Sequence, residues 1–311
     1  MAVENVTAVA DWLREEFAFS GRVRDRLQTI LIDLIRSRAV KGILIEDVSN
    51  DGAVVSLVGL GVSFFLTAEL AELYVTRPFP FLFADVIERI AAGERVVLDL
   101  DGIAQANSGP GLNLIVQYLQ RGWDLADPYW REVGGIGHKT YVQHHSGYHL
   151  RRALQEDWTT NAGIYLAAGY RELAVVPVAG RAQAGGEGGP TRTIFYADES
   201  DVLSRAPGSS VSYVFHRRAP VCGFTPYEQD VLSLGISGAT DSDIADALGV
   251  TLAAIKHAWQ NIYERLGNHV SYVLPSSGDG RRGPEKRRRV LAFVEQHPEE
   301  LRPFAKPGRT A

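Results

Sequence analysis

The chain is poor in the residues and motifs on which several kinds of site depend. Its 311 residues include a single cysteine, Cys222, so an intramolecular disulfide and a cysteine-rich zinc site are excluded. No Gly-rich phosphate loop links a strand pattern to a helix pattern, and no Gly-x-Ser-x-Gly nucleophile motif is present. The sequence therefore predicts no catalytic residues, no metal and no cofactor, and we expect a protein that is not an enzyme.

Long apolar segments are also absent. No apolar run approaches the roughly 18 residues of a membrane-spanning helix, and the N-terminal segment carries acids where a signal peptide needs bases. We therefore expect a cytoplasmic protein without membrane contact. The composition, 45% apolar and 22% charged, is ordinary for a globular protein, and the length suggests two domains.

The most distinctive segment is residues 224–267, where three helix starts follow one another. Each start has a threonine suited to cap the helix, and the first two have an acid three residues later, which makes two capping boxes. These positions are Thr225 with Glu228, Thr240 with Asp243, and Thr251. Apolar residues recur at helical spacing after each start. Two helices joined by a short Gly-containing turn form a helix-turn-helix, whose second helix can lie in the DNA major groove.

This segment resembles the DNA-binding domain of LuxR-type (GerE-like) transcription regulators. The matches are at residues 225–228, 231–232, 238, 244–250, 255–256 and 261–267. The resemblance implies a C-terminal all-α helix-turn-helix domain that binds double-stranded DNA, as a homodimer because such domains read two half-sites. The DNA-binding residues that we expect are Thr240, Thr251, Lys256, His257, Gln260, Asn261 and, in a basic run that follows, Arg287 and Arg288.

The segment departs from the LuxR pattern at two places. The family usually has a histidine two residues after the lysine of its recognition helix, where this chain has Ala258. The second helix opens with Asp241 and Asp243, and their negative charge opposes that of the DNA phosphates. These departures favour an alternative, a regulator that binds a protein partner and has weak or lost DNA binding.

The first 215 residues alternate between helix and strand patterns. Residues 22–38 carry the apolar stripe of an amphipathic helix, and two strand-like runs on either side of Asp51-Gly52 predict a hairpin. Further expected elements are a helix at residues 79–92 and strands at residues 95–100, 171–178 and 193–196. We predict an α+β fold, with an antiparallel sheet and its helices in residues 1–215 and a helical domain in residues 216–311.

The order of these elements resembles that of GAF domains, which are relatives of PAS domains. The likeness rests on the helix at residues 22–38, the hairpin, and residues 93–98 and 169–177. It implies a sensory domain whose sheet holds a small molecule. Residues 95–104 also resemble the start of a STAS domain, which binds protein partners, and this alternative stays open.

Aromatic residues are concentrated between residues 122 and 170. Aromatic side chains with polar tips line many ligand pockets, although they can equally form a core. The ligand-binding residues that we expect are Trp123, Tyr129, Trp130, Tyr141 and Trp158. Trp123-Asp124 and residues 127–130 also resemble part of the pocket motif of acyl-homoserine-lactone receptors, so quorum sensing is a minor alternative.

Four histidines lie within the same aromatic segment, at His138, His144, His145 and His149. His145 and His149 would share a face of a helix, a spacing that can hold a metal. Ser146-Gly147 indicates a turn between them, so we expect polar histidines without a metal. Together these patterns predict a cytoplasmic transcription regulator that responds to a small molecule through its N-terminal domain.

Overall fold

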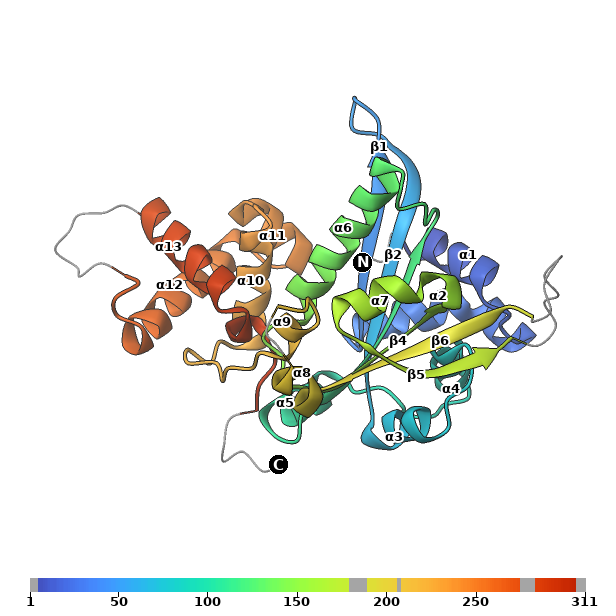
Figure 1. Cartoon of the computed structure of the whole chain (residues 1–311). Helices are drawn as coiled ribbons and strands as arrows, with labels where there is room; N and C mark the ends of the chain where they lie inside the picture. The colour runs from blue at the N-terminus through green and yellow to red at the C-terminus, as the bar shows by residue number, and fades with distance from the viewer. Residues whose placement is uncertain (1–4, 179–188, 206–207, 275–282, 306–311) are drawn as a thin grey trace.

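A computed structural model describes residues 5–178, 189–205, 208–274 and 283–305 (Figure 1). One six-stranded sheet, with strand order β1-β2-β3-β4-β6-β5, forms the centre of the first 200 residues. The strands are β1 (Val40–Val48), β2 (Val54–Leu66), β3 (Leu112–Gln120), β4 (Leu150–Trp158), β5 (Arg171–Pro177) and β6 (Thr191–Asp198). Neighbouring strands are antiparallel except β3 and β4, which are parallel.

Helices cover both faces of this sheet and form a cluster after it (Figure 1). The helices that precede β4 are α1 (Val6–Glu16), α2 (Gly21–Arg36), α3 (Ala68–Thr76), α4 (Leu82–Ala91), α5 (Leu100–Ser108) and α6 (Pro128–His145). The short helices that follow β4 are η2 (Thr159–Asn161), α7 (Ala162–Ala168), α8 (Glu199–Ser204) and α9 (Ser212–Phe215). The C-terminal cluster consists of α10 (Pro226–Ile236), α11 (Asp241–Leu248), α12 (Leu252–His269), α13 (Gly283–Gln296) and η3 (Pro298–Leu301). No helix in the described ranges is long and apolar enough to cross a bilayer.

Alternation along the strands divides the core into two layers. Leu60, Val62 and Phe64 of β2 pack with α1 to α4 on one face, whereas Phe65 packs with β3, α6 and α7 on the other. Successive strand residues point to opposite faces, so a helix on each side buries the whole strand. A third core lies within the C-terminal helices.

The parallel strands β3 and β4 pair over only part of their length. Their ladder ends at Val116 and Gln155, after which β3 pairs only with β2 and β4 only with β6. Gln117 Nε2 spans the gap and donates to the carbonyl oxygen of Glu156 at 3.4 Å. The centre of the sheet is therefore split at the C-terminal ends of these two strands.

The split is closed on the α1–α4 face by a buried ion pair. Arg192 Nε lies 2.7 Å from Glu156 Oε1, and both side chains are almost fully buried. The Glu156 carboxylate also accepts hydrogen bonds from the backbone N–H groups of Phe81 and Leu82, at the start of α4. Burial raises the pKa of Glu156, and the Arg192 charge acts against that shift. One carboxylate thus joins β4, β6 and α4.

The C-terminal cluster is joined to the sheet through the end of α6. Arg302 donates from Nη2 to the carbonyl oxygen of Gln143 at 2.8 Å and from Nε to that of Ser146 at 2.9 Å. Gly147 has φ +84°, and a Cβ atom there would lie 2.4 Å from the backbone nitrogen of Glu299. Only glycine allows this close approach of the two backbones.

Most local predictions are confirmed, but the predicted fold class is wrong. The amphipathic helix, the β1–β2 hairpin, both capping boxes and the Thr251 cap are present. The sheet is mixed rather than the antiparallel GAF/PAS-like sheet that we expected, because β3 and β4 are parallel central strands. Residues 95–100 form no strand beyond an isolated bridge at Val97, since Leu100 already begins α5. The division at residue 215 stays a prediction.

The buried pair generates a stability prediction. Changing Glu156 to Gln leaves the Arg192 charge buried with only the more distant Glu16, so we expect the free energy of unfolding to fall by about 3–5 kcal/mol. Glu72→Gln removes an exposed partner of Arg152 and should cost less than about 1 kcal/mol. Urea unfolding of both variants measures the difference, and equal losses would contradict the assignment.

Candidate functional site

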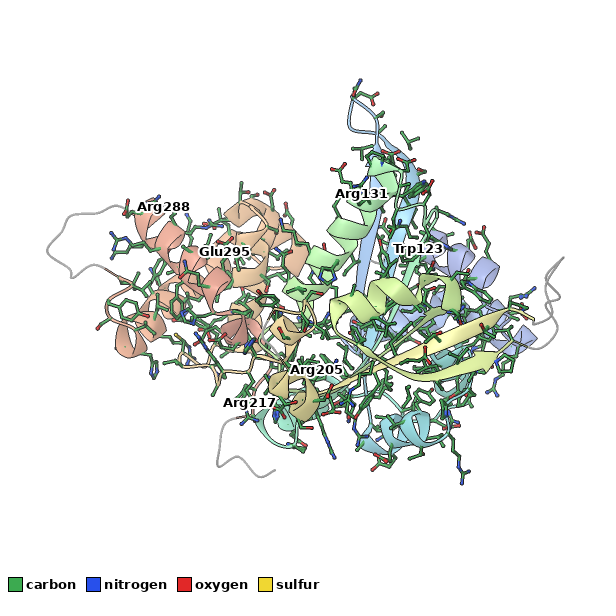
Figure 2. The ribbon with its side chains drawn as sticks, in the orientation of Figure 1. Trp123, Arg131, Arg205, Arg217, Arg288 and Glu295 are labelled. Carbon is green, nitrogen blue, oxygen red and sulfur yellow. The ribbon has the colours of Figure 1, made fainter. Side chains whose placement is uncertain are left out.

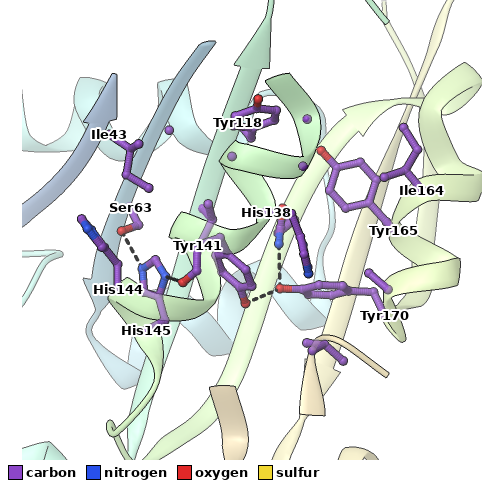
Figure 3. A pocket seen from close by; sticks show the side chains of 18 of the residues that line it. Ile43, Ser63, Tyr118, His138, Tyr141, His144, His145, Ile164, Tyr165 and Tyr170 are labelled. Atoms are coloured by element: carbon purple, nitrogen blue, oxygen red, sulfur yellow. Dashed lines mark hydrogen bonds between the residues drawn. The ribbon is translucent and has the colours of Figure 1, made fainter. Parts of the chain in front are cut away.

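The main candidate site is a cavity of about 350 Å³ between the sheet and helices α6 and α7 (Figure 3). Val116 and Gln155, the last pair of the β3–β4 ladder, both line it, so the cavity lies where the two strands part. Its walls are mainly apolar, with a few polar side chains that converge from β2, α6, β4 and the start of β5. A mostly apolar hollow with few polar groups is typical of small-molecule sites.

Helix α6 forms one wall of this cavity with glycines. Asp127 caps the helix by accepting from the Tyr129 N–H, and Pro128 occupies its first turn. Gly134, Gly135 and Gly137 lie on the cavity side. Glycine lowers the stability of a helix by about 1 kcal/mol relative to alanine, but it leaves space beside the strands. A Cβ atom at Gly137 would lie 2.6 Å from the Tyr118 hydroxyl, so α6 could not pack this closely with a larger residue.

Two tyrosines and a glutamine form a buried hydrogen-bond chain at the cavity. Tyr141 and Tyr170 have their hydroxyl oxygens 2.7 Å apart, and Gln155 Nε2 donates to Tyr170 Oη, also at 2.7 Å (Figure 3). Burial raises the pKa of Tyr170 to about 12 and that of Tyr141 well above its ordinary value. Both phenols therefore stay neutral near pH 7 and can take part in a hydrogen bond to a ligand.

Ser63 and His145 form a second polar group in the wall. His145 Nδ1 lies 2.8 Å from the Tyr141 carbonyl oxygen, which can only accept, so Nδ1 carries the hydrogen. Nε2 then accepts the Ser63 hydroxyl hydrogen at 2.9 Å, and the Ser63 oxygen is left as an acceptor. Burial, and next the Lys41 charge, lower the pKa of His145 well below its ordinary value. The pair is thus a weak base and supplies a hydrogen-bond acceptor.

The structure brings only two of the five expected ligand-binding residues to the cavity, Trp123 and Tyr141. Tyr129 is exposed and donates to Asp47, and Trp130 lies over Gly122 and packs with Val133. Trp158 is on the opposite face of the sheet, stacked on Arg192. Sequence reasoning missed Ser63, Gln155 and Tyr170, although the strand alternation that points Ser63 and Gln155 to one face was available as a signal.

The four histidines do not converge. His145 is buried in the wall, while His138 and His144 lie on other positions of α6. His149 is beyond the helix end, with Arg217 Nη1 2.8 Å from its Nε2 near the junction of the two parts of the chain (Figure 2). In the ranges that the structure describes, no group of three or more His, Cys, Asp or Glu side chains is arranged to hold a metal ion.

The expected DNA-binding residues lie on three different helices and have mixed surroundings. Thr240 and Thr251 use their hydroxyls to cap α11 and α12. Arg287 is held by Asp241 at 2.6 Å and stacks on Trp259, so its charge is already partnered. Lys256, His257, Gln260 and Asn261 lie on α12, and Arg288 is 79% exposed on α13 (Figure 2). No single basic surface is formed.

Comparisons with known proteins find no matching family model and no matching curated protein. Solved structures similar to this chain include a spermidine N-acetyltransferase, SpeG, from Vibrio cholerae, with a TM-score of 0.34 and 10% identity over 64% of this chain and 93% of that one. A GNAT-family acetyltransferase structure from Desulfovibrio desulfuricans has a TM-score of 0.31 and 10% identity, over 63% and 92% of the two chains. Similarity this low assigns neither an activity nor a substrate to this chain.

These comparisons nevertheless point away from the regulator that we expected. The similar structures are acetyltransferases, so the predictions of a LuxR-type regulator with a GAF/PAS-like sensor, of DNA as a partner and of a non-enzyme are wrong. The physical reasons agree: the sheet is mixed, Asp241 neutralises Arg287, and α11 begins with acids. The homodimer was inferred from paired DNA half-sites and loses its basis as well.

The cavity wall generates a prediction about pH. Burial, with Lys41 and Arg302 next in effect, lowers the pKa of His144 from 6.5 to about 4. Between these values the unfolded chain binds the proton and the folded chain does not, so stability falls as pH drops from 6.5 towards 4. Each such group contributes at most about 1.4 kcal/mol per pH unit.

We expect His144→Gln to flatten this part of the stability profile, because the variant cannot take up that proton in its unfolded state. Urea unfolding at a series of pH values measures the slope. Asp157, whose pKa is raised to about 6 by burial, acts in the opposite sense in both proteins and cancels in the comparison. An unchanged slope in the variant would show that His144 titrates normally.

Proposed function

We propose that this protein binds a small, mostly apolar molecule with one polar end in the cavity between the sheet, α6 and α7. The observation that carries the proposal is the cavity itself, whose volume of about 350 Å³ lies in the usual range of small-molecule sites. The apolar body of the ligand would contact Ile43, Val116 and Ile164. Its polar end would meet the Tyr141–Tyr170 pair and the Ser63 oxygen.

The charges around the cavity favour a neutral or weakly anionic ligand. Lys41 and Arg131 line it, and among its lining residues in the described ranges there is no Asp or Glu. A polyamine such as spermidine, the substrate named for the similar Vibrio cholerae enzyme, is a polycation and would need carboxylates. Polyamine binding is therefore not part of the proposal. A cytoplasmic location is part of it, supported by the single free thiol at Cys222.

Gly61 gives a direct test of the cavity. A Cβ atom at this position would be in ordinary contact with Ile43 at 3.5 Å and Tyr118 at 3.8 Å, two residues of the cavity wall. Gly61→Leu should therefore occupy ligand space, and we expect it to weaken binding at least about tenfold, which is about 1.4 kcal/mol. Ser56→Leu, on the same strand but outside the cavity, is the matched control and should bind as the native protein does.

The measurement is a thermal-shift screen of small amphipathic molecules. A ligand that binds only the folded state at a hundredfold excess over Kd stabilises it by about 2.7 kcal/mol. Mass spectrometry of each stabilising molecule after incubation shows whether it is also converted. If no molecule stabilises the native protein, or if Gly61→Leu and Ser56→Leu respond alike, the proposal is wrong.

A further inference from the structure

A second cavity lies between the sheet and the C-terminal helices. Its volume is about 340 Å³, and its walls come from α2, β1, α5, α10 and the segment after η3. Unlike the first cavity it is lined by many charged and polar groups, including Lys41, Tyr148 and Arg302. Lys41 and His144 line both cavities and so form part of the wall between them.

Two cations enclose one phenol in this second cavity. Lys41 Nζ is 4.8 Å from the centre of the Tyr148 ring, and Arg302 Cζ is 4.9 Å from it. Lys41 comes from β1, Tyr148 follows α6, and Arg302 follows η3, so three separate segments meet here. The Tyr148 side chain is almost fully buried.

The positive charge of this group has no partner within the protein. Arg38 also lines the cavity, but Asp230 neutralises it at 2.6 Å. In the described ranges no carboxylate lies within ion-pair distance of Lys41 or Arg302. Glu299 is the acid that acts on Arg302 from nearby, and its carboxylate is held by His297 at 3.1 Å. Two cations are therefore close together without a counter-ion.

Such an arrangement is costly unless an anion completes it. Buried charges in proteins are normally paired, because removing them from water costs several kcal/mol each. Burial lowers the pKa of Lys41 and of Arg302. Burial alone would raise the pKa of Tyr148, but the two cations bring it below its ordinary value. The cavity thus has a strongly positive potential around the Tyr148 hydroxyl.

We propose that the second cavity binds a small organic anion, with its carboxylate or phosphate group held by Lys41, Arg302 and the Tyr148 hydroxyl. Ile35, Leu100 and Ile103 line the same cavity and would contact the carbon skeleton. Since Arg302 already holds the end of α6, the anion would connect β1 to the C-terminal segment and strengthen the attachment of the helical cluster.

The test uses the full chain, with inorganic phosphate and succinate as probes and sodium chloride at matched ionic strength as the reference. We expect phosphate or succinate to raise the melting temperature above that in chloride. Lys41→Met should be more stable than the native protein in chloride, because an unpaired charge is gone, and should lose the response to both probes. Lys139→Met removes an exposed lysine of α6 and should keep the response.

Tyr148→Phe provides a second variant that keeps the ring between the two cations. Losing a hydrogen bond to a charged group should weaken anion binding about ten- to a hundredfold, as measured by calorimetric titration. Gly61→Leu alters only the first cavity and should leave anion binding intact. Equal stabilisation by chloride, or a Lys41→Met protein that responds like the native one, would overturn the proposal.

Discussion

The parallel pairing of β3 and β4 is the constraint on which the rest of the structure depends. Two parallel neighbours need a crossover, and α6 provides it across one face of the sheet. The two strands part after Val116 and Gln155, which leaves a split that neighbouring strands do not fill. Because α6 has glycines on its inner side, the space under it remains open and becomes the first cavity.

Polar groups close the split differently on its two faces. On the α1–α4 face, Glu156 and Arg192 neutralise each other and hold the start of α4, so this side is rigid and fully occupied. On the α6 face, Tyr170 and Gln155 are satisfied by one another but border open space. The same pair of strands therefore gives one side a structural role and leaves the other to bind a ligand.

Helix α6 also connects the two cavities. Its middle lines the first cavity, and its C-terminal carbonyl groups are held by Arg302 beside the second. Lys41 and His144 belong to both, so a ligand in either cavity would change the surroundings of the same two side chains. The C-terminal helices are thus held to the sheet at a point where charge, rather than apolar burial, is concentrated.

The sequence by itself determined the local elements. Capping boxes at Thr225 and Thr240, the hairpin turn at Gly52 and the apolar stripe of α2 depend on residues close in the chain, and all are present. Tertiary structure alone decided that β3 and β4 are parallel and that Ser63 meets His145, 82 residues away. β4 was missed because Gln155 and Asp157 point inward, where their polarity hides the strand pattern. Tyr129, Trp130 and Trp158 were misplaced because aromatic composition does not specify a sheet face, which depends on long-range pairing.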